Sequence, residues 1–354
     1  MHLRPSTRSE TLAAIVAASL LVATDAGLWV MGSSAGETPL NLFSLQTTDA
    51  AASVTGAGLS EGFSILTQSG QDNLARIVGF GPVSALVSQF GRANQVEILQ
   101  QGSGLISVVE QGLAPGAASI FEADLAQVRS GTTDPFGGVS GNRAFIDQAG
   151  TNNRSVVGQF GSDALADVFQ RGADNLSSIL QSGNDASAFV SQTGERNGSM
   201  LRQHDFSVRA SVTQIGTDGR SEGRQWDQSS GSELRVYQAG SQAMSDIDQG
   251  GVRNMAMLVQ WDQSERVSST IIQDGTRAHA RVDQAGEDLT AIVRQRSGEG
   301  NVAEVYQAGL ANVSEIDQSG DGNQARSRQG ATGNRSTIVQ NGSGNVAVVT
   351  QSAP

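Results

Sequence analysis

Carboxamide side chains recur in this chain at a fixed interval of eleven residues. From Gln307 to Gln351 a glutamine opens each row of eleven, and an asparagine takes the sixth place of every complete row. A carboxamide offers two N–H donors and a carbonyl acceptor, and an enclosed one costs about 1–3 kcal/mol when its partners are missing. Identical amides stacked on one another would satisfy each other, so the spacing predicts amide ladders that fix the register of the fold.

The residues predicted to form these ladders open the rows or take their sixth place. The glutamines are Gln148, Gln159, Gln170, Gln181, Gln192, Gln203, Gln214, Gln238, Gln249, Gln273, Gln284, Gln307, Gln318, Gln329, Gln340 and Gln351. The asparagines are Asn73, Asn94, Asn153, Asn175, Asn197, Asn254, Asn312, Asn323, Asn334 and Asn345.

Other side chains that could do chemistry do not cluster in the sequence. An enzyme built on a β-helix, such as a polysaccharide lyase, would show grouped carboxylates, arginines, lysines or histidines that depart from the repeat. The chain has no lysine and no cysteine, and its histidines, His2, His204 and His279, are scattered. The Gly-Gly-x-Gly-x-Asp run of calcium-binding repeats is missing as well. We therefore expect no catalytic, cofactor-binding or metal-binding residues and no enzymatic activity.

Two further features each leave two interpretations open. Trp226 and Trp261 both follow a row glutamine in a Gln-Trp-Asp-Gln run, in rows that carry two extra residues. They either pack within a longer turn or form an adhesive site on which carbohydrate could stack. The carboxylates that directly precede a row glutamine are either ordinary solvated groups or like charges that slow premature stacking during export. They are Asp147, Asp248, Asp283 and Asp317.

The elements that carry the amides are predicted to be short strands joined by turns. After each row asparagine the side chains alternate with period two, in runs rich in Val, Ile, Ser and Ala. The glycine two places after most row glutamines would cost about 1 kcal/mol per site inside a helix. Each row therefore predicts a strand of about five to seven residues and a turn of about four.

The alternation assigns the two faces of each strand. Asn175, Ser177, Ile179 and Gln181 should point into a narrow core, whereas Leu180 and the other residues between them should point to solvent. Across the rows, the first set is uniform and the second set is variable and often charged. Uniform positions indicate enclosure, so the predicted core is narrow, filled by small and aliphatic side chains and lined by amides.

Two rows are predicted to close one coil of 22 residues. Three rows per coil would also satisfy the arithmetic, but neighbouring rows pair better by twos, since Asn153, Asn175 and Asn197 alternate with Ala164 and Ala186. The predicted fold class is all-β, a β-solenoid of stacked two-strand coils. Successive coils would then lie about 4.8 Å apart.

The N-terminal segment has the features of a secretory signal peptide. Arg4 and Arg8 precede the apolar run 12–23, and a small-residue cleavage pattern ends at Ala35. The alternative is a transmembrane helix across residues 12–31, which Asp25 would interrupt. We predict a signal peptide over residues 1–35, with cleavage after Ala35 or, as the alternative, after Ala26.

The rest of the chain divides into segments that follow the eleven-residue period to different degrees. Residues 36–61 are either a flexible lead-in or a degenerate repeat, in which Gln46 stands two periods before Gln68. Residues 62–122 form a first repeat block and residues 142–351 a second one. Residues 123–141 break the period and predict an irregular loop or hinge between the blocks.

Composition restricts the partners of the chain. Only 16% of the 354 residues are charged and 5% are aromatic, which is too poor in large apolar side chains for an ordinary globular core of this length. The formal net charge is −12 and every basic residue is arginine. An acidic chain without a basic patch argues against a nucleic-acid partner.

The row pattern Gln-x-Gly-x-x-Asn-x-Ala-x-x-x-Gln resembles the curlin repeat of curli fibre subunits. Residues 318–329 match it closely, as do residues 340–351, 249–260 and 68–75. The resemblance implies a β-solenoid with two strands per coil and secretion across the outer membrane of a Gram-negative bacterium. It also implies assembly into extracellular amyloid fibres for adhesion and biofilm matrix. The implied partners are further copies of the chain, other curlin-type subunits and an outer-membrane secretion apparatus, and no cofactor is implied.

The last rows favour assembly through the C-terminal coil. The row 340–351 is among the best matches to the repeat, and no proline occurs between Phe136 and Ala353. We expect this coil to lack a cap and to extend its strands into the next molecule. The alternative is a monomeric secreted or surface-attached β-solenoid that acts as an adhesin or carbohydrate-binding module.

Overall fold

The computed structural model describes residues 28–32, 40–57, 63–112, 139–226, 229–262 and 264–352. These residues form strands and turns and contain no helix. In chain order the strands are β1 (Leu28–Gly32), β2 (Leu40–Ala57), β3 (Phe63–Phe80), β4 (Val83–Arg92), β5 (Gln95–Ser103), β6 (Leu105–Gln111), β7 (Arg143–Thr151), β8 (Arg154–Gln159), β9 (Leu165–Ala173), β10 (Leu176–Gln181), β11 (Ser187–Glu195), β12 (Gly198–Gln203), β13 (Arg209–Thr217), β14 (Arg220–Gln225), β15 (Glu233–Ser241), β16 (Met244–Gln249), β17 (Met255–Gln260), β18 (Ser268–Gln273), β19 (His279–Glu287), β20 (Thr290–Arg296), β21 (Val302–Leu310), β22 (Val313–Ser319), β23 (Gln324–Thr332), β24 (Arg335–Asn341) and β25 (Val346–Ser352).

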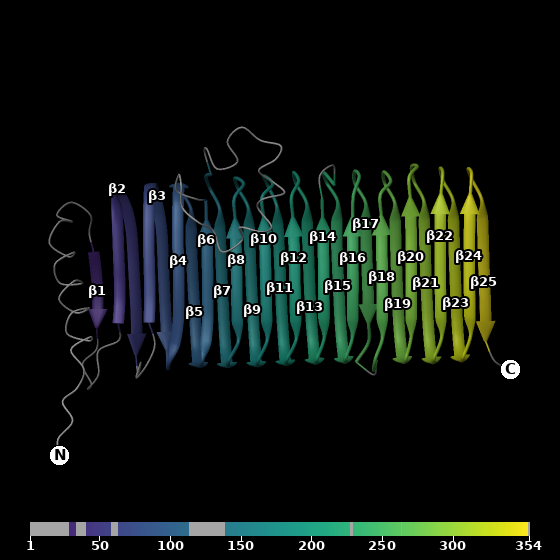
Figure 1. The fold of residues 1–354 in the computed structure, drawn as a ribbon, viewed down its shortest axis with the longest axis horizontal. Helices are drawn as coiled ribbons and strands as arrows, with labels where there is room; N and C mark the ends of the chain where they lie inside the picture. The colour runs from purple at the N-terminus through teal and green to yellow at the C-terminus, as the bar shows by residue number, and fades with distance from the viewer. Residues whose placement is uncertain are drawn as a thin grey trace, which may run out of the picture.

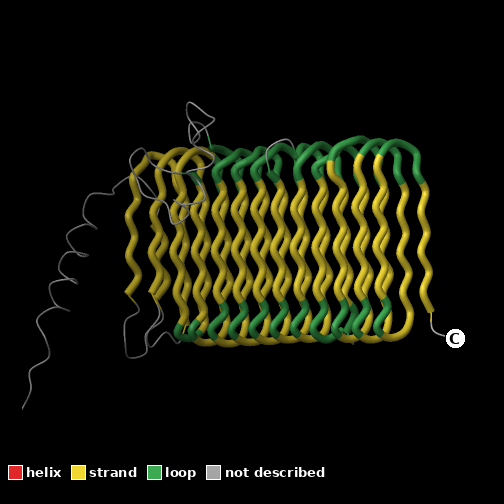
Figure 2. Tube along the Cα trace, turned by 45° about the vertical axis from the view of Figure 1, so that its right-hand side comes forward, coloured by secondary structure: helices red, strands yellow, loops and turns green. Residues whose placement is uncertain are grey.

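The strands stack along one axis as a parallel β-solenoid (Figures 1 and 2). From β4 onwards each strand pairs in parallel with the strand two places further along the chain, as β10 does with β12 and β8 with β10. Leu176 therefore lies opposite Gly198, 22 residues later. Two strands make one coil, which confirms the predicted all-β solenoid and excludes three rows per coil. The sheet of β4, β6 and the following even-numbered strands is called the even sheet, and that of β5, β7 and the following odd-numbered strands the odd sheet.

The core between the two sheets is narrow, and it follows the predicted alternation. Along β10 the residues Ser177, Ile179 and Gln181 are fully buried, and the same positions in the other coils are filled by Ala, Val, Leu, Ile and Ser. Leu180 corrects the prediction of an outward, solvent-facing residue, because it is also buried. Alternation predicts the side of the sheet on which a residue lies and not what covers that side. Glu110, in the same outer row, is buried too.

Strand length differs between the two sheets, which the sequence did not predict. Even-sheet strands such as β12 have six residues and end at the row glutamine, whereas odd-sheet strands such as β11 have nine. In β11 the chain stays extended past Gln192 and through Gly194, whose φ is 117°, and turns only at Arg196, which has a φ of 55°. The expectation of five to seven residues is therefore wrong for most of the odd sheet.

The solenoid continues across the predicted break in the period. β5 pairs with β7 and β6 pairs with β8, so Gln100 lies opposite Gln148, 48 residues later instead of 22. Most of the predicted loop or hinge, and the end of the first block, lie outside the described residues, which resume at Val139. The coils on either side are thus direct neighbours in the stack.

The first strands extend the stack beyond the predicted repeat blocks. β3 spans one whole coil, pairing with β4 through Phe63–Gln71 and with β5 through Leu74–Phe80. β2, in the predicted lead-in, pairs with β3, and β1, within the predicted signal peptide, pairs with β2. Gln68 lies opposite Leu45 and not opposite Gln46, so the predicted alignment of Gln46 with Gln68 is wrong. The rest of the predicted signal peptide lies outside the described residues.

Candidate functional site

Row glutamines form two continuous hydrogen-bonded ladders through the core, one per sheet. In each step the Nε2 of one glutamine donates to the Oε1 of the glutamine in the next coil, over 2.5 to 3.1 Å. The even-sheet ladder comprises Gln68, Gln89, Gln111, Gln159, Gln181, Gln203, Gln225, Gln249, Gln273, Gln295, Gln318 and Gln340. The odd-sheet ladder comprises Gln100, Gln148, Gln170, Gln192, Gln214, Gln238, Gln260, Gln284, Gln307, Gln329 and Gln351.

Seven of these ladder members were not among the predicted residues, although they obey the same period. They are Gln68, Gln89, Gln100, Gln111, Gln225, Gln260 and Gln295. The last three open the rows that carry extra residues, and the first four lie in the less regular first block. The signal that could have identified them is the alternating run that precedes each glutamine, because insertions in the following turn do not disturb it.

The direction of the amides is fixed by a second hydrogen bond. The Nε2 of Gln181 also donates to the backbone carbonyl of Leu165 (2.9 Å), and that of Gln192 donates to the carbonyl of Leu176 (3.0 Å). Turning an amide over would place its Oε1 against a carbonyl oxygen. Both ladders are therefore polar, and in each ladder step the amide donates towards the C-terminal end of the stack.

The row asparagines brace the turns and link neighbouring coils. The Oδ1 of Asn175 accepts a hydrogen bond from the backbone N–H of Asn197 (3.1 Å), and its Nδ2 donates to the carbonyl of Gly194 (2.9 Å). The residue before it, Asp174, has a φ of 55°, a left-handed conformation that recurs at this place in the rows. The asparagine thus ties a strained turn to the turn of the next coil.

The predicted asparagines stack only in short runs. Asn153, Asn175 and Asn197 are linked to one another, as are Asn73 and Asn94, Asn312 and Asn334, and Asn323 and Asn345. Asn254 instead contacts Ser232 and Ala278, because neighbouring rows have other residues at this position. Asn142 and Asn301, which were not predicted, extend two of these runs.

A family model for the curlin associated repeat matches residues 161–194. These residues are a curlin associated repeat, and the chain that contains them is called the curlin-repeat protein from here on. The matched segment carries Gln170, Gln181 and Gln192 of the ladders, and the coils on both sides repeat its geometry. A search among curated proteins found no match. Family and fold together support a curli-like structural or adhesive role.

The last coil of the curlin-repeat protein is open on one side. In the part of the chain that the structure describes, β24 pairs only with β22 and β25 only with β23. Val339, Val346 and Val348 are 63–70% exposed, and the inward-facing Val349 is only partly buried. Figure 2 shows this end of the stack beside the C-terminus. The coil thus offers a free strand edge and the end of a hydrophobic core.

Hydrogen-bonding atoms are left without partners near both ends of the stack. The Oε1 atoms of Gln68 and Gln100 are buried and unpartnered, and the residue opposite Gln100 in the preceding coil is Gly79. At the other end the Nδ2 of Asn334 has no partner, whereas that of Asn312 donates to the carbonyl of Ala331. Among the carboxamide side chains, the buried unpartnered atoms are thus acceptors near the first coils and a donor in the last coil.

The outer surface of the curlin-repeat protein carries ion pairs that bridge adjacent coils. Arg196 pairs with Asp218 (2.7 Å), and this guanidinium holds the pKa of the Asp218 carboxyl below its usual value. Arg266 does the same for the pKa of Asp288. Exposed pairs of this kind contribute little to stability, because solvent screens them. They therefore align the coils less strongly than the buried amides do.

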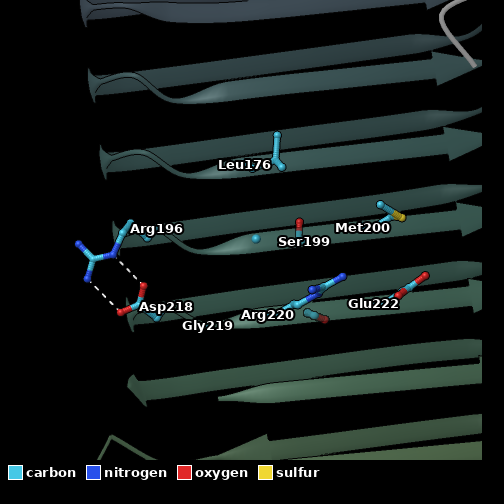
Figure 3. A pocket seen from close by; sticks show the side chains of 10 residues that line it. Leu176, Arg196, Ser199, Met200, Asp218, Gly219, Arg220 and Glu222 are labelled. Carbon is cyan, nitrogen blue, oxygen red and sulfur yellow. Dashed lines mark hydrogen bonds and ion pairs between the residues drawn. The ribbon is translucent and has the colours of Figure 1, made fainter. Parts of the chain in front are cut away.

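A shallow hollow of about 410 Å³ lies on the even sheet beside one of these pairs. Figure 3 shows Leu176 and Met200 beside it, with Arg196 and Asp218 at its rim. Gly198 leaves this space, because a side chain there would meet no other atom within 4 Å. The hollow is shallow and open to solvent, so it carries no site assignment.

The two tryptophans lie at opposite edges of the solenoid. Trp226 follows β14 and stacks on the ring of His204, with centroids 5.1 Å apart. Trp261 follows β17, is 47% exposed, and donates from Nε1 to Asp283 (2.5 Å), with Tyr237 nearby. They do not form a common site. Among the described residues there is no cluster of acidic, histidine or cysteine side chains that could hold a metal ion, and no helix that could cross a membrane.

Proposed function

We propose that this curlin-repeat protein is a structural subunit of an extracellular curli-type amyloid fibre that serves adhesion and biofilm matrix. The open last coil carries the proposal. Its inward residues, Ala347, Val349 and Gln351, continue the columns of the preceding coils, and its outer side has no partner strand in the described chain. A coil of another subunit placed there would continue both sheets.

The backbone of β25 supports this joint. In each coil the first outward residue of a strand donates its N–H to the next coil, as Leu176 does to the carbonyl of Asn197 and Gln324 to that of Asn345. Val346 holds the same place in β25, so its N–H faces the open side. By the alternation of a parallel ladder, the N–H of Val348 faces the same way. Unpaired groups of this kind are a template for strand addition.

The remaining parts of the proposal rest on the family. The protein would be exported with the help of the segment 1–35, would cross the outer membrane of a Gram-negative bacterium through a secretion apparatus, and would assemble with itself or with other curlin-type subunits. It would act without catalysis, cofactor or nucleic acid. The ladder residues would serve as the stacking and register elements of the fibre.

A second candidate function is that of a monomeric adhesin or carbohydrate-binding module. The observation that favours it is the exposed ring of Trp261, which lies 6.4 Å from that of Tyr237 between ring centroids. Aromatic rings in such a pair can stack on a sugar ring. In this second function the chain would be a monomeric solenoid that forms no fibre.

X-ray fibre diffraction on the purified protein from Gly36, after long incubation at high concentration, tests the proposal. A meridional reflection near about 4.7 Å, together with amyloid-dye binding, is the expected result. A β-rich monomer that never assembles and binds no dye would overturn the proposal that the protein is a fibre subunit. In that case, binding of an oligosaccharide that is lost on Trp261→Ala would support the adhesin.

A further inference from the structure

A carboxylate lies among apolar side chains on the outer face of the odd sheet. Asp167 in β9 is opposite Phe145 in β7 and Phe189 in β11, one coil away on either side. The alternation along β9 places Leu165 and Phe169 next to it on the same face. Asp167 therefore has an apolar side chain on each of its four sides.

The three phenylalanines form one contiguous group of rings. The ring centroids of Phe145 and Phe169 are 5.4 Å apart, and those of Phe169 and Phe189 are 5.6 Å apart. Phe189 is 36% exposed, so the group is open to solvent. Because a phenylalanine side chain is longer than that of aspartate, the rings form walls and the carboxylate of Asp167 forms the floor between them.

This carboxylate has no counter-charge in the part of the chain that the structure describes. No ion pair or hydrogen bond joins its side chain to another residue, and burial alone raises its pKa. Arg171, further along the same face of β9, pairs with Asp147 instead (2.5 Å). A partly buried carboxylate without a partner costs free energy, and a bound cation would offset that cost.

The rings determine which kind of cation fits. An aromatic face attracts a cation that lies within about 6 Å of the ring centroid. Phe145 and Phe189 are two coils apart, so a cation above Asp167 would lie about 5 Å along the axis from each of them. A guanidinium or primary ammonium brings several N–H donors, and among these side chains only the carboxylate accepts. A quaternary ammonium has no N–H and leaves no donor unsatisfied.

We infer that Asp167 and the three surrounding phenylalanines bind a quaternary ammonium group of the choline type. The carboxylate supplies the opposite charge, and the rings supply cation–π contacts on its sides. The same group occurs in a free solute and in the headgroup of a choline phospholipid. The site goes beyond the proposed fibre, because it needs three adjacent coils of one molecule and no assembly.

Titration of the purified protein with choline chloride, followed by ligand-observed NMR, tests the inference. We expect Asp167→Asn to weaken choline binding at least about tenfold. Asp317→Asn is the control, because it removes an equal charge from the even sheet and should leave binding unchanged. The neutral analogue of choline, in which carbon replaces nitrogen, should bind the wild type at least about tenfold more weakly than choline. Equal binding by both probes, equal binding to all three proteins, or no choline binding would overturn the inference.

Flotation with phosphatidylcholine vesicles separates the two sources of the group. Vesicle binding that is lost in Asp167→Asn would identify the lipid headgroup, and choline binding without vesicle binding would identify the free solute. Folding gives an independent measurement, since Asp167→Asn removes a partly buried charge and should not lower the thermal midpoint at pH 7. A lower midpoint would show that Asp167 is needed by the fold and would overturn the assignment. Dye-monitored assembly of the same samples tests the fibre separately.

Discussion

Each interior ladder glutamine makes three hydrogen bonds that join three coils. Gln192 accepts from Gln170 (2.7 Å), donates to Gln214 (2.8 Å) and donates to the carbonyl of Leu176 (3.0 Å). It is fully buried, so no water replaces a lost partner. Removing one glutamine side chain therefore destabilises the solenoid mainly through the hydrogen-bonding groups that it leaves unsatisfied.

Replacing Gln192 by leucine should destabilise the solenoid strongly. The change leaves one N–H of the Gln170 amide and the Oε1 of Gln214 without partners, while the other N–H of Gln170 keeps its bond to the carbonyl of Arg154. We expect a loss of about 3 kcal/mol in the free energy of unfolding. Urea titration followed by circular dichroism measures it. Ser191→Ala, one residue earlier on the outer face, should change stability by less than about 0.5 kcal/mol. Equal effects of the two changes would show that the amide does not matter.

Glycines in the two kinds of position should respond oppositely to alanine. At Gly194 the φ is 117° and a Cβ would lie 1.9 Å from the carbonyl oxygen of Gly216, whereas at Gly198 a Cβ meets nothing within 4 Å. Gly194→Ala should cost at least about 2 kcal/mol, because it combines backbone strain with a clash between coils. Gly198→Ala should be neutral or stabilising. Thermal melts of both variants compare them, and a similar loss at both sites would contradict the stacking distance.

Sequence spacing determines which residues share a column, and for glutamine it does so well because a strand tolerates no insertion. It contains no information on which amide atom faces which neighbour, so the polarity of the ladders could not be predicted. The same holds for Leu180, whose burial depends on what covers the outer face.

At the scale of elements, the two strands of a coil end differently although their rows look alike. Period two predicted the strand, and the pairing of rows by twos predicted the coil, which the structure confirms. Strand ends could not be predicted, because Gly194 keeps β11 extended while the chain after β12 turns directly after Gln203. The residue at which each strand ends depends on how its turn packs on the turn of the next coil.

A proline in the free edge strand β25 should leave the fold intact but prevent this edge from pairing with the strand of an added molecule. Val348 is 64% exposed, and its N–H faces away from β23, so Val348→Pro removes a donor only from the open side. We expect an unchanged circular dichroism spectrum and at least about tenfold slower dye-monitored assembly. Val348→Thr keeps the N–H and is the control. Growth of the proline variant at the control rate would mean that assembly uses another surface.

At the scale of the whole molecule, charge opposes association. The net charge is −12, and several outer carboxylates are partly buried. Asp167, between Phe145 and Phe189 in its column, has its pKa raised by burial, and burial likewise raises the pKa values of Asp246 and Asp248. These carboxylates take up protons first as the pH falls from neutrality.

Mild acid should therefore speed assembly without unfolding the solenoid. A carboxyl whose pKa is raised by folding destabilises the folded state above that pKa, and the penalty is relieved as the pH falls through it. Asp218 and Asp288 have lowered pKa values, so their contribution is lost only in stronger acid. We expect faster dye-monitored assembly at about pH 5 than at pH 7, with no drop in thermal midpoint. Added salt should reduce the difference, and slower assembly in mild acid would contradict the argument.

The step from Gln100 to Gln148 has a practical consequence for protein engineering. These amides are joined over 3.0 Å although 48 residues separate them, and the neighbouring strands keep their register. The stack thus keeps its register although the chain between Gly112 and Val139 separates the two coils in sequence. A small enzyme or epitope grafted between these two residues would be carried at one fixed place on every molecule, and a polymer of such molecules would hold its cargo at regular spacing.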